Sequence, residues 1–262
     1  MQTMTTSGII RVKDELGLVY DLSKIEYMIR EDDSYEYVFT PNYSVIDLLK
    51  PDIFQGIPGL NLDLRKEKYV RANRTPVFIS ERTPGENRED LWELLEACGM
   101  DHLNRLEWLI RTDSVYSGDR FFVDRYEEVP QPITIQNMEE LGNRSVNINR
   151  KLLDVICSGG KLVSPDFIIN DSTRGIYYPV LLEMFRTEKR YLKMQQDNGV
   201  RESKDKGKYK GRKRKDTGGL KAVEIIRDYY GGKLTADQAA ERMDVSRSTF
   251  FRRAGEYRSE KL

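Results

Sequence analysis

The sequence predicts an α/β protein in which a body with a mainly parallel sheet precedes an all-α helix-turn-helix domain. Strand-like and helix-like segments alternate through residues 1–178, a pattern that favours parallel strands joined by helical crossovers. A Gly-interrupted basic run then separates this body from three short helical segments. The chain has 262 residues, which is enough for one large domain or two modest ones.

The charge distribution also separates the two parts. Residues 201–262 carry 18 Lys and Arg against 10 Asp and Glu, a net charge of +8, so the first 200 residues carry −8. A basic tail on an acidic body indicates that the tail binds a polyanion, and a solvated tail without a ligand is the alternative. No apolar run has the length of a membrane span and the first residues lack a signal-peptide pattern, so we expect a cytoplasmic protein.

Short apolar runs and helical periodicity assign the elements of the body, residues 1–178. Strands are expected at Ile9–Val12, Phe121–Val123, Lys161–Val163 and Phe167–Ile169. Helices are expected at Glu89–Cys98, Leu103–Arg111, Ile133–Leu141 and Val146–Cys157. Residues 32–82 do not follow the alternation, and we treat them as an insertion of unassigned structure.

A long helix is predicted over residues 179–199, between the body and the basic run. Pro179 is typical of a first helical turn and Gly199 of a helix end. The apolar face is broader than a lone surface helix needs, so we expect it to pack partly on the body and partly on a partner. This face consists of Leu181, Met184, Phe185, Tyr191, Leu192 and Met194. Residues 200–219 are nearly devoid of apolar side chains and are predicted to form an extended linker.

Residues 220–262 have the pattern of three short helices. The first is predicted over Leu220–Tyr230 and ends at Gly231 and Gly232. Its expected apolar face consists of Leu220, Val223, Ile226 and Tyr230. Thr235 and Ser246 are the expected N-caps of the second and third helices.

A tight turn at Asp244 and Val245 joins the last two helices, because Asp tolerates a left-handed backbone. The residues expected at their contact are Ala239, Ala240, Met243, Val245 and Phe250. This arrangement matches the helix-turn-helix plan, in which the last helix enters the DNA major groove. We therefore predict double-stranded DNA as the partner, and a protein-binding helical tail is the alternative. The predicted DNA contacts in this domain are Ser246, Arg247, Ser248, Thr249, Arg252 and Arg253, with Phe251 on the same outer face.

Four successive segments together resemble the C-terminal part of the serine recombinases, the resolvase and DNA-invertase family. They are GGKLVSPDFIINDSTRG, the helix PVLLEMFRTEKRYLKMQQDNGV, the linker KGKYKGRKRK and the helix-turn-helix pattern. The resemblance implies a resolvase-like α/β domain, a dimerising helix and a linker that follows the minor groove. The linker residues that it implies as DNA contacts are Lys210, Gly211, Arg212, Lys213 and Arg214.

The N-terminal body departs from the family at the positions that would carry catalysis. The family's nucleophilic serine follows Arg-Val, whereas Lys13 follows Arg11-Val12 here, and lysine cannot form a phosphoserine bond. Arg88, in SERTPGENRED, matches an arginine of the family's mobile loop. Arg125 matches one of two arginines that neutralise the phosphate, but the second is missing and Glu127 and Glu128 would repel it. The resemblance therefore implies a catalytically degenerate relative.

Three hypotheses follow. The first is a DNA-binding homodimer, or a mixed oligomer with an active recombinase, that acts as a regulator or accessory factor in DNA recombination encoded by a bacterium or phage. The second is an active recombinase with a nucleophile elsewhere, for which Ser114 and Ser117 are candidates. The third is a transcription regulator whose N-terminal domain is unrelated to recombinases. We expect no cofactor and no metal site, because Cys98, Cys157 and the single histidine, His102, lack ligand spacing.

Overall fold

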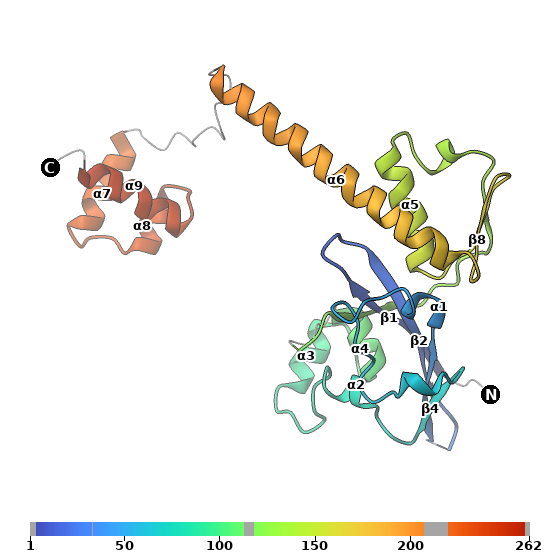
Figure 1. Cartoon of the computed structure of the whole chain (residues 1–262). Coiled ribbons are helices and arrows are strands. Elements are labelled where there is room, and N and C mark those ends of the chain that lie inside the picture. The colour runs from blue at the N-terminus through green and yellow to red at the C-terminus, as the bar shows by residue number, and fades with distance from the viewer. Residues whose placement is uncertain (1–3, 33, 113–117, 207–219, 260–262) are drawn as a thin grey trace. The chain divides into compact units, whose positions relative to one another are not determined.

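The computed structural model describes residues 4–32, 34–112, 118–206 and 220–259. The chain divides into two compact units, Met1–Gln195 and Gln196–Leu262, and each has a hydrophobic core of its own. Figure 1 shows the helices and strands of both units. The fold is mixed α/β, as the sequence predicts at this coarse level.

Within the described residues, the main sheet of the first unit has five strands in the order β4-β3-β2-β1-β5. They are β1 (Met4–Lys13), β2 (Val19–Ile29), β3 (Tyr35–Pro41), β4 (Tyr69–Ala72) and β5 (Phe121–Arg125). Every neighbouring pair in this sheet is antiparallel. The strands expected at Ile9–Val12 and Phe121–Val123 are confirmed as parts of β1 and β5.

The prediction of a mainly parallel sheet is wrong. A tight turn joins β1 to β2, in which the Asp14 carboxylate accepts a hydrogen bond from the Leu18 amide (2.8 Å) and Gly17 has a φ of 81°. Short connections of this kind join antiparallel strands, because a parallel pair needs a crossover of about a dozen residues or more. The prediction failed because β2 and β3, two strands of this sheet, were not identified as strands.

Residues 32–82 belong to the sheet and its core, so their assignment as an insertion is also wrong. They contribute β3, β4, the helices α1 (Tyr43–Ile46) and α2 (Val77–Ser80) and the 3-10 helix η1 (Leu62–Leu64). Phe39, Phe78 and Ile79 from this segment are fully buried. The segment therefore supplies part of the hydrophobic core of the first unit.

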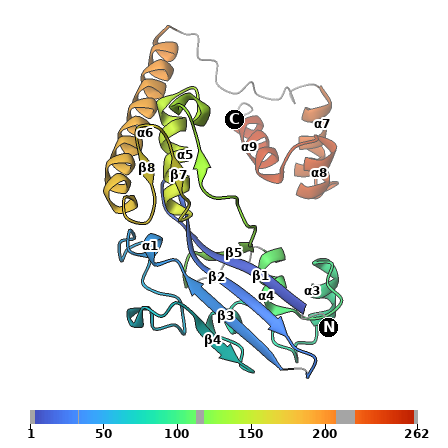
Figure 2. The same cartoon turned by 90° about the vertical axis from the view of Figure 1, so that its right-hand side faces the viewer.

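The main sheet has one face in the core and one face rich in ion pairs. On the core side, Ile10 and Tyr37 are buried together with residues of α3 (Leu91–Ala97) and α4 (Arg105–Thr112). Figure 2 shows these two helices near β1. These two helices confirm the predicted Glu89–Cys98 and Leu103–Arg111 segments. On the opposite face Lys24 pairs with Glu26 (2.8 Å). This division follows from the two-residue period of strand side chains.

A smaller sheet in the described residues consists of β6 (Ile133–Thr134), β7 (Leu162–Val163) and β8 (Ile168–Ile169), in which β6 and β7 are parallel. The helix predicted over Ile133–Leu141 is wrong, because β6 is followed there by the 3-10 helix η2 (Met138–Leu141). A capping box between Asn137 and Glu140 fixes the start of η2. The helix α5 (Ser145–Cys157) confirms the predicted Val146–Cys157 segment.

The long helix α6 (Arg174–Asp205) extends beyond the predicted 179–199 at both ends. Pro179 lies inside the helix rather than at its start, and the helix continues through Gly199. Tyr178, Leu182 and Phe185 are buried against the core of the first unit. From Lys189 to Gly199 every residue is exposed.

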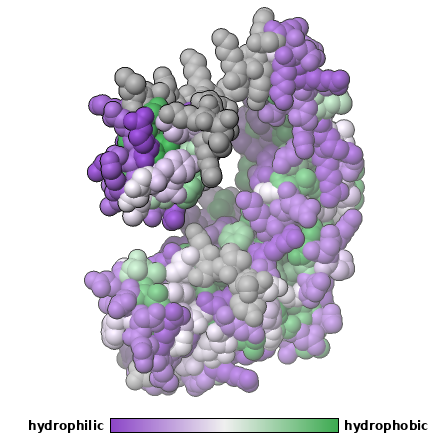
Figure 3. All heavy atoms as spheres, turned by 90° about the vertical axis from the view of Figure 1, so that its left-hand side faces the viewer, coloured by the Kyte–Doolittle hydropathy of each residue, from purple (hydrophilic) through white to green (hydrophobic). Residues whose placement is uncertain are grey.

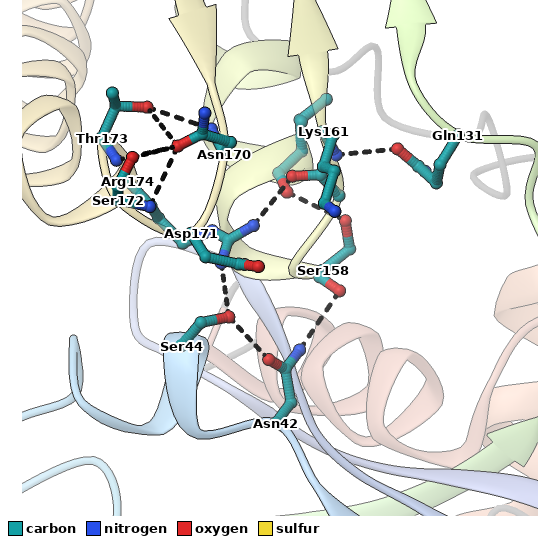
Figure 4. Close-up of polar contacts among 12 residues, drawn as sticks. Asn42, Ser44, Gln131, Ser158, Lys161, Asn170, Asp171, Ser172, Thr173 and Arg174 are labelled. Carbon is teal, nitrogen blue, oxygen red and sulfur yellow. Dashed lines mark hydrogen bonds and ion pairs between the residues drawn. The ribbon is translucent and has the colours of Figure 1, made fainter.

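Polar contacts fix the beginning of α6, which is why the helix starts before Pro179. The Asn170 carboxamide accepts hydrogen bonds from the Ser172 and Thr173 amides (2.9 and 3.1 Å). The fully buried Arg174 guanidinium donates to the Gly160 carbonyl (2.8 Å), the Asp171 carboxylate (2.8 Å) and the Ser44 hydroxyl, as Figure 4 shows. These contacts tie the helix to α1 and to the chain that follows α5.

The second unit contains α7 (Leu220–Tyr230), α8 (Ala236–Arg242) and α9 (Arg247–Ser259). These helices match the predicted triplet. Of the predicted linker, residues 200–205 belong to α6, and residues 207–219 lie outside the described residues. On the face of the molecule drawn in Figure 3, hydrophilic residues predominate and hydrophobic residues form separate patches.

Candidate nucleic-acid interface

Local hydrogen bonds define the start of α8 and the turn into α9. Thr235 and Gln238 form a reciprocal capping box, in which the Thr235 hydroxyl accepts from the Gln238 amide (3.3 Å) and the Gln238 carboxamide accepts from the Thr235 amide (3.0 Å). Asp244 has a left-handed backbone with a φ of 51°. The Ser246 hydroxyl accepts from the Thr249 amide (3.4 Å) and caps α9. The predicted caps and turn are therefore confirmed.

A small core holds the three helices at a fixed crossing. Ala239 and Ala240 are buried where α8 and α9 meet, and Phe250 is completely buried. Tyr229 of α7 packs edge-on against Phe250, with ring centroids 5.0 Å apart. The predicted contact residues between α8 and α9 are confirmed by their burial, with Met243 buried and Val245 partly buried.

The buried face of α7 differs from the predicted one. Ala222 and Ile226 are buried and Ile225 packs against them, whereas Tyr230 is 50% exposed. The Tyr230 hydroxyl nevertheless donates a hydrogen bond to the Ala254 carbonyl (3.0 Å) of α9. Helical spacing identified the helix and the buried Ile226, but it wrongly placed Tyr230 on the buried face and missed Ala222.

One side of α9 presents exposed side chains suited to DNA. Arg247, Ser248, Phe251 and Arg252 are exposed, and their spacing places them on a common helical face. The Arg247 guanidinium lies over the Phe251 ring, 5.8 Å from its centroid, and 3.4 Å from the Asp237 carboxylate. Both partners of this ion pair are well exposed, so it is weak and exchangeable.

Three other predicted contacts on α9 lie differently. The Ser246 and Thr249 hydroxyls are 2.9 Å apart and take part in the cap of the helix. The Arg253 side chain is 21% exposed and lies 3.3 Å from the Glu256 carboxylate. Arg247 and Arg252 are therefore the cations best placed for a phosphate or a base. The predicted linker contacts, residues 210–214, lie outside the described residues.

Arg11, one of the resolvase-like positions, is held by carboxylates of its own chain. Its guanidinium lies 2.7 Å from Asp21 and 2.5 Å from Asp124, on the ion-paired face of the main sheet. Burial raises the pKa of the Asp21 carboxyl, against the opposing effect of Arg11. Lys13 is exposed at the end of β1.

Arg125 and Arg88 are likewise engaged, and the structure does not bring them to Arg11. Arg125 contacts Glu107 of α4 (2.5 Å), so it points to the core side of the sheet, opposite to Arg11. Burial acts to raise the pKa of Glu107, but hydrogen bonds from Arg111 and Arg125 outweigh it and lower that pKa. Arg88 pairs with the neighbouring Asp90. These guanidiniums do not form a phosphate clamp in this arrangement.

The other candidate groups offer no alternative centre within the part of the chain that the structure describes. Ser114 and Ser117 lie outside that part. His102 contacts the adjacent Asp101 (2.6 Å), and no cluster of potential metal ligands occurs among the described residues. Cys157 is buried, and Cys98 is partly buried. In the same residues, no helix combines the length and apolarity needed to cross a membrane.

The exposed part of α6 carries an apolar stripe with the residue spacing of a helix–helix contact. Val180, Met184, Tyr191 and Met194 are each about half exposed, and Thr187 lies between them in the same spacing of three and four residues. The residues on the other sides of this part are mostly charged or polar. This stripe has the pattern of a helix–helix contact.

Sequence reasoning missed the acidic partners of the resolvase-like arginines and a basic segment at β4. Asp124, a partner of Arg11, directly precedes Arg125 in the sequence, so this carboxylate could have been noticed. The Arg11–Asp21 contact depends on strand register and the Arg125–Glu107 contact on helix packing. The β4 segment LRKEKYVRANR has five basic residues and was visible in the sequence. No family model matches this chain, and no curated protein has a matching sequence.

Proposed function

We propose that this protein binds double-stranded DNA through α9 and does not cut it. The observation that carries the proposal is the exposed face of Arg247, Ser248 and Arg252 on a capped helix that follows a tight turn. A helix presented in this way fits the major groove, where Arg reads guanine edges and phosphates fix the register. The net charge of +8 in residues 201–262 favours the same partner.

The first unit supports a role without strand cleavage. Lys13 stands where the resemblance places a nucleophilic serine, and Arg11, Arg88 and Arg125 pair with carboxylates. A phosphate at these positions would have to displace Asp or Glu side chains and would gain no nucleophile. We therefore propose a regulator or accessory factor of DNA recombination rather than an active recombinase.

The antiparallel sheet favours a second candidate function, a transcription regulator whose first unit is unrelated to recombinases. The resemblance to serine recombinases implies a parallel sheet, and the sheet in residues 4–125 is antiparallel. The recombination role therefore depends on the C-terminal resemblance, whereas DNA binding depends on α8 and α9 in either case.

The stripe on α6 supports a dimer. Half-exposed apolar side chains at Val180, Met184, Tyr191 and Met194 are costly in water and are buried when a second helix packs along them. We propose a homodimer through this helix, and a mixed oligomer with an active recombinase would use the same surface. Two reading helices would then bind two half-sites of a DNA target.

The test selects binding sites from a random duplex pool with the full chain and then looks for covalent adducts on nicked and supercoiled versions of the selected site. The expected result is an enriched motif, protected in footprinting, without an adduct. No enrichment would contradict DNA binding. An adduct that disappears when one serine is mutated would contradict the non-cutting role.

A further inference from the structure

β4 is an edge strand of the main sheet, and part of its backbone has no partner strand. The Asn73 amide donates to the Tyr35 carbonyl (2.7 Å) and the Tyr35 amide to the Asn73 carboxamide (2.9 Å), so these residues take the place of a hydrogen-bonded pair beyond the end of the strand. In an antiparallel ladder such pairs alternate with non-hydrogen-bonded ones. Tyr69 and Arg71 therefore bond to β3, and Val70 and Ala72 direct their backbone groups away from it.

The outward groups of β4 are largely available. The Val70 carbonyl accepts a hydrogen bond from the Arg71 guanidinium (3.1 Å). In the described part of the chain, the Val70 amide and the Ala72 amide and carbonyl have no hydrogen-bond partner. A strand laid along this edge would find two donors and one acceptor in the spacing of a β-ladder, and a second acceptor if Arg71 moved aside.

Large apolar side chains are exposed on β4 and in the chain segments before and after it. Val70 is 48% exposed on the sheet face opposite to the buried Tyr69. Val77 is 43% exposed and lies close to Gly59, whose carbonyl accepts a hydrogen bond from Arg71 (2.9 Å). Leu64 is 58% exposed in the same segment of the chain. Of these side chains, Val70 is the one that lies on β4 itself.

The charges around the edge are mostly positive, and Asp63 and Glu67 are the exposed acidic residues of the same segment. Lys66, Lys68 and Arg74 are exposed, and none of them forms an ion pair with another described residue. Arg65 is paired with Asp47 (2.6 Å) and stacks on Tyr43. The unpaired ammonium and guanidinium groups therefore favour a partner segment that carries carboxylates.

We propose that β4 binds an extended, acidic segment of a partner protein as an added strand of the sheet. Backbone hydrogen bonds to Val70 and Ala72 give affinity, the exposed Val70 side chain contacts an apolar residue of the segment, and the lysines select acidic ones. Lysines often protect an edge strand from pairing, and in that case a peptide of neither charge would bind. A second copy of β4 is disfavoured, because it would place the same cations opposite each other.

The test measures binding of a fluorescent ten-residue peptide of alternating Glu and Val to the full chain, by anisotropy without DNA. A peptide with Lys in place of Glu is the charge control. The expected result is saturable binding of the acidic peptide, at least tenfold tighter than that of the basic one. Hydrogen exchange should slow at the Val70 and Ala72 amides and stay unchanged at Arg71.

Val70→Pro is the sharpest variant, because it removes an outward amide without removing a bond to β3. It should weaken peptide binding at least tenfold, and Val70→Thr, which keeps the amide, should weaken it no more than a few-fold. The double variant Lys66→Glu, Lys68→Glu should also bind the peptide at least tenfold more weakly. The matched control Lys151→Glu, Lys161→Glu should not lose this affinity. Ala72→Pro repeats the amide test if Val70→Pro does not fold.

Absence of peptide binding up to millimolar concentration, or equal binding by Val70→Pro and the wild type, would overturn the proposal. The cations could instead contact DNA phosphates, and in that case Lys66→Glu, Lys68→Glu would weaken DNA binding while the peptide did not bind. That outcome also overturns the proposal but leaves DNA binding by α9 intact. If variants on α9 did not weaken DNA binding, the proposed function would be contradicted, but the peptide result at β4 would still stand.

Discussion

An arginine is available to a phosphate when no carboxylate of its own chain already holds it. Arg11 and Arg125 are held in this way, with carboxylate contacts of 2.7 Å and 2.5 Å to Asp21 and Glu107. Arg252 is exposed on α9 without an ion pair to any described residue, and Arg247 has one exposed partner. The difference between these two groups supports the proposal that the second unit contacts DNA.

Arg252→Ala should weaken DNA binding by about 1–3 kcal/mol, and Arg247→Ala by a similar amount. Each change removes a cation from the exposed face of α9 and leaves its buried face intact. Anisotropy titration with the selected duplex measures both losses. Arg227→Ala, an exposed arginine on α7, is the control, and an equal loss there would show a charge effect without a defined interface.

Cys157→Ala should reduce the loss of stability at alkaline pH. Burial, together with the Asp154 charge, raises the pKa of the Cys157 thiol. Above the unfolded value of about 8.5 the unfolded chain loses a proton that the native thiol keeps, so the free energy of unfolding falls as pH rises. Urea unfolding between about pH 8 and 10 should show a smaller slope in the variant. Cys98→Ala is the matched control, and an unchanged slope in Cys157→Ala would contradict the assignment.

At the scale of elements, the sequence predicts helices with explicit caps much better than strands. Thr235, Asp244 and Ser246 carry side chains with one local role each, so α8, the turn and α9 could be identified from them. β2 and β3 have no comparable local signal, because pairing between distant residues stabilises them. The parallel sheet was predicted for that reason, and the ion pairs of Arg11 could not be predicted without the register.

Thr235→Ala should destabilise the second unit by about 1 kcal/mol, because it removes the hydroxyl of the capping box. Thermal unfolding followed by circular dichroism measures the loss. Thr235→Ser keeps the hydroxyl and should restore most of the stability. If Thr235→Ser were as unstable as Thr235→Ala, the lost methyl group rather than the cap would explain the change.

Met184→Glu combined with Tyr191→Glu should convert the proposed dimer to a monomer. Both side chains are about half exposed on the α6 stripe, and two carboxylates there would be buried against their own copies. Sedimentation velocity on the full chain reports the change in mass. Lys193→Glu, off the stripe, is the control, and a wild-type protein that sediments as a monomer would contradict the dimer.

At the scale of the whole molecule, the two proposed functions belong to different units. The first unit has the larger core and an acidic balance, and the second has a small core and a basic balance. Each hydrophobic core consists of residues from one unit only. A change on α9 should therefore alter DNA binding without altering peptide binding at β4. The proposed partner at β4 and the proposed DNA site on α9 are therefore separable by mutation.

The most direct measurement of the central claim is the salt dependence of DNA binding by the full chain and by Arg247→Ala, Arg252→Ala. With roughly four phosphate contacts, the wild-type affinity should fall about a hundredfold between 50 and 200 mM salt. The double variant should bind more weakly and with a shallower slope. An affinity that changes neither with salt concentration nor on loss of these two arginines would contradict DNA recognition through α9.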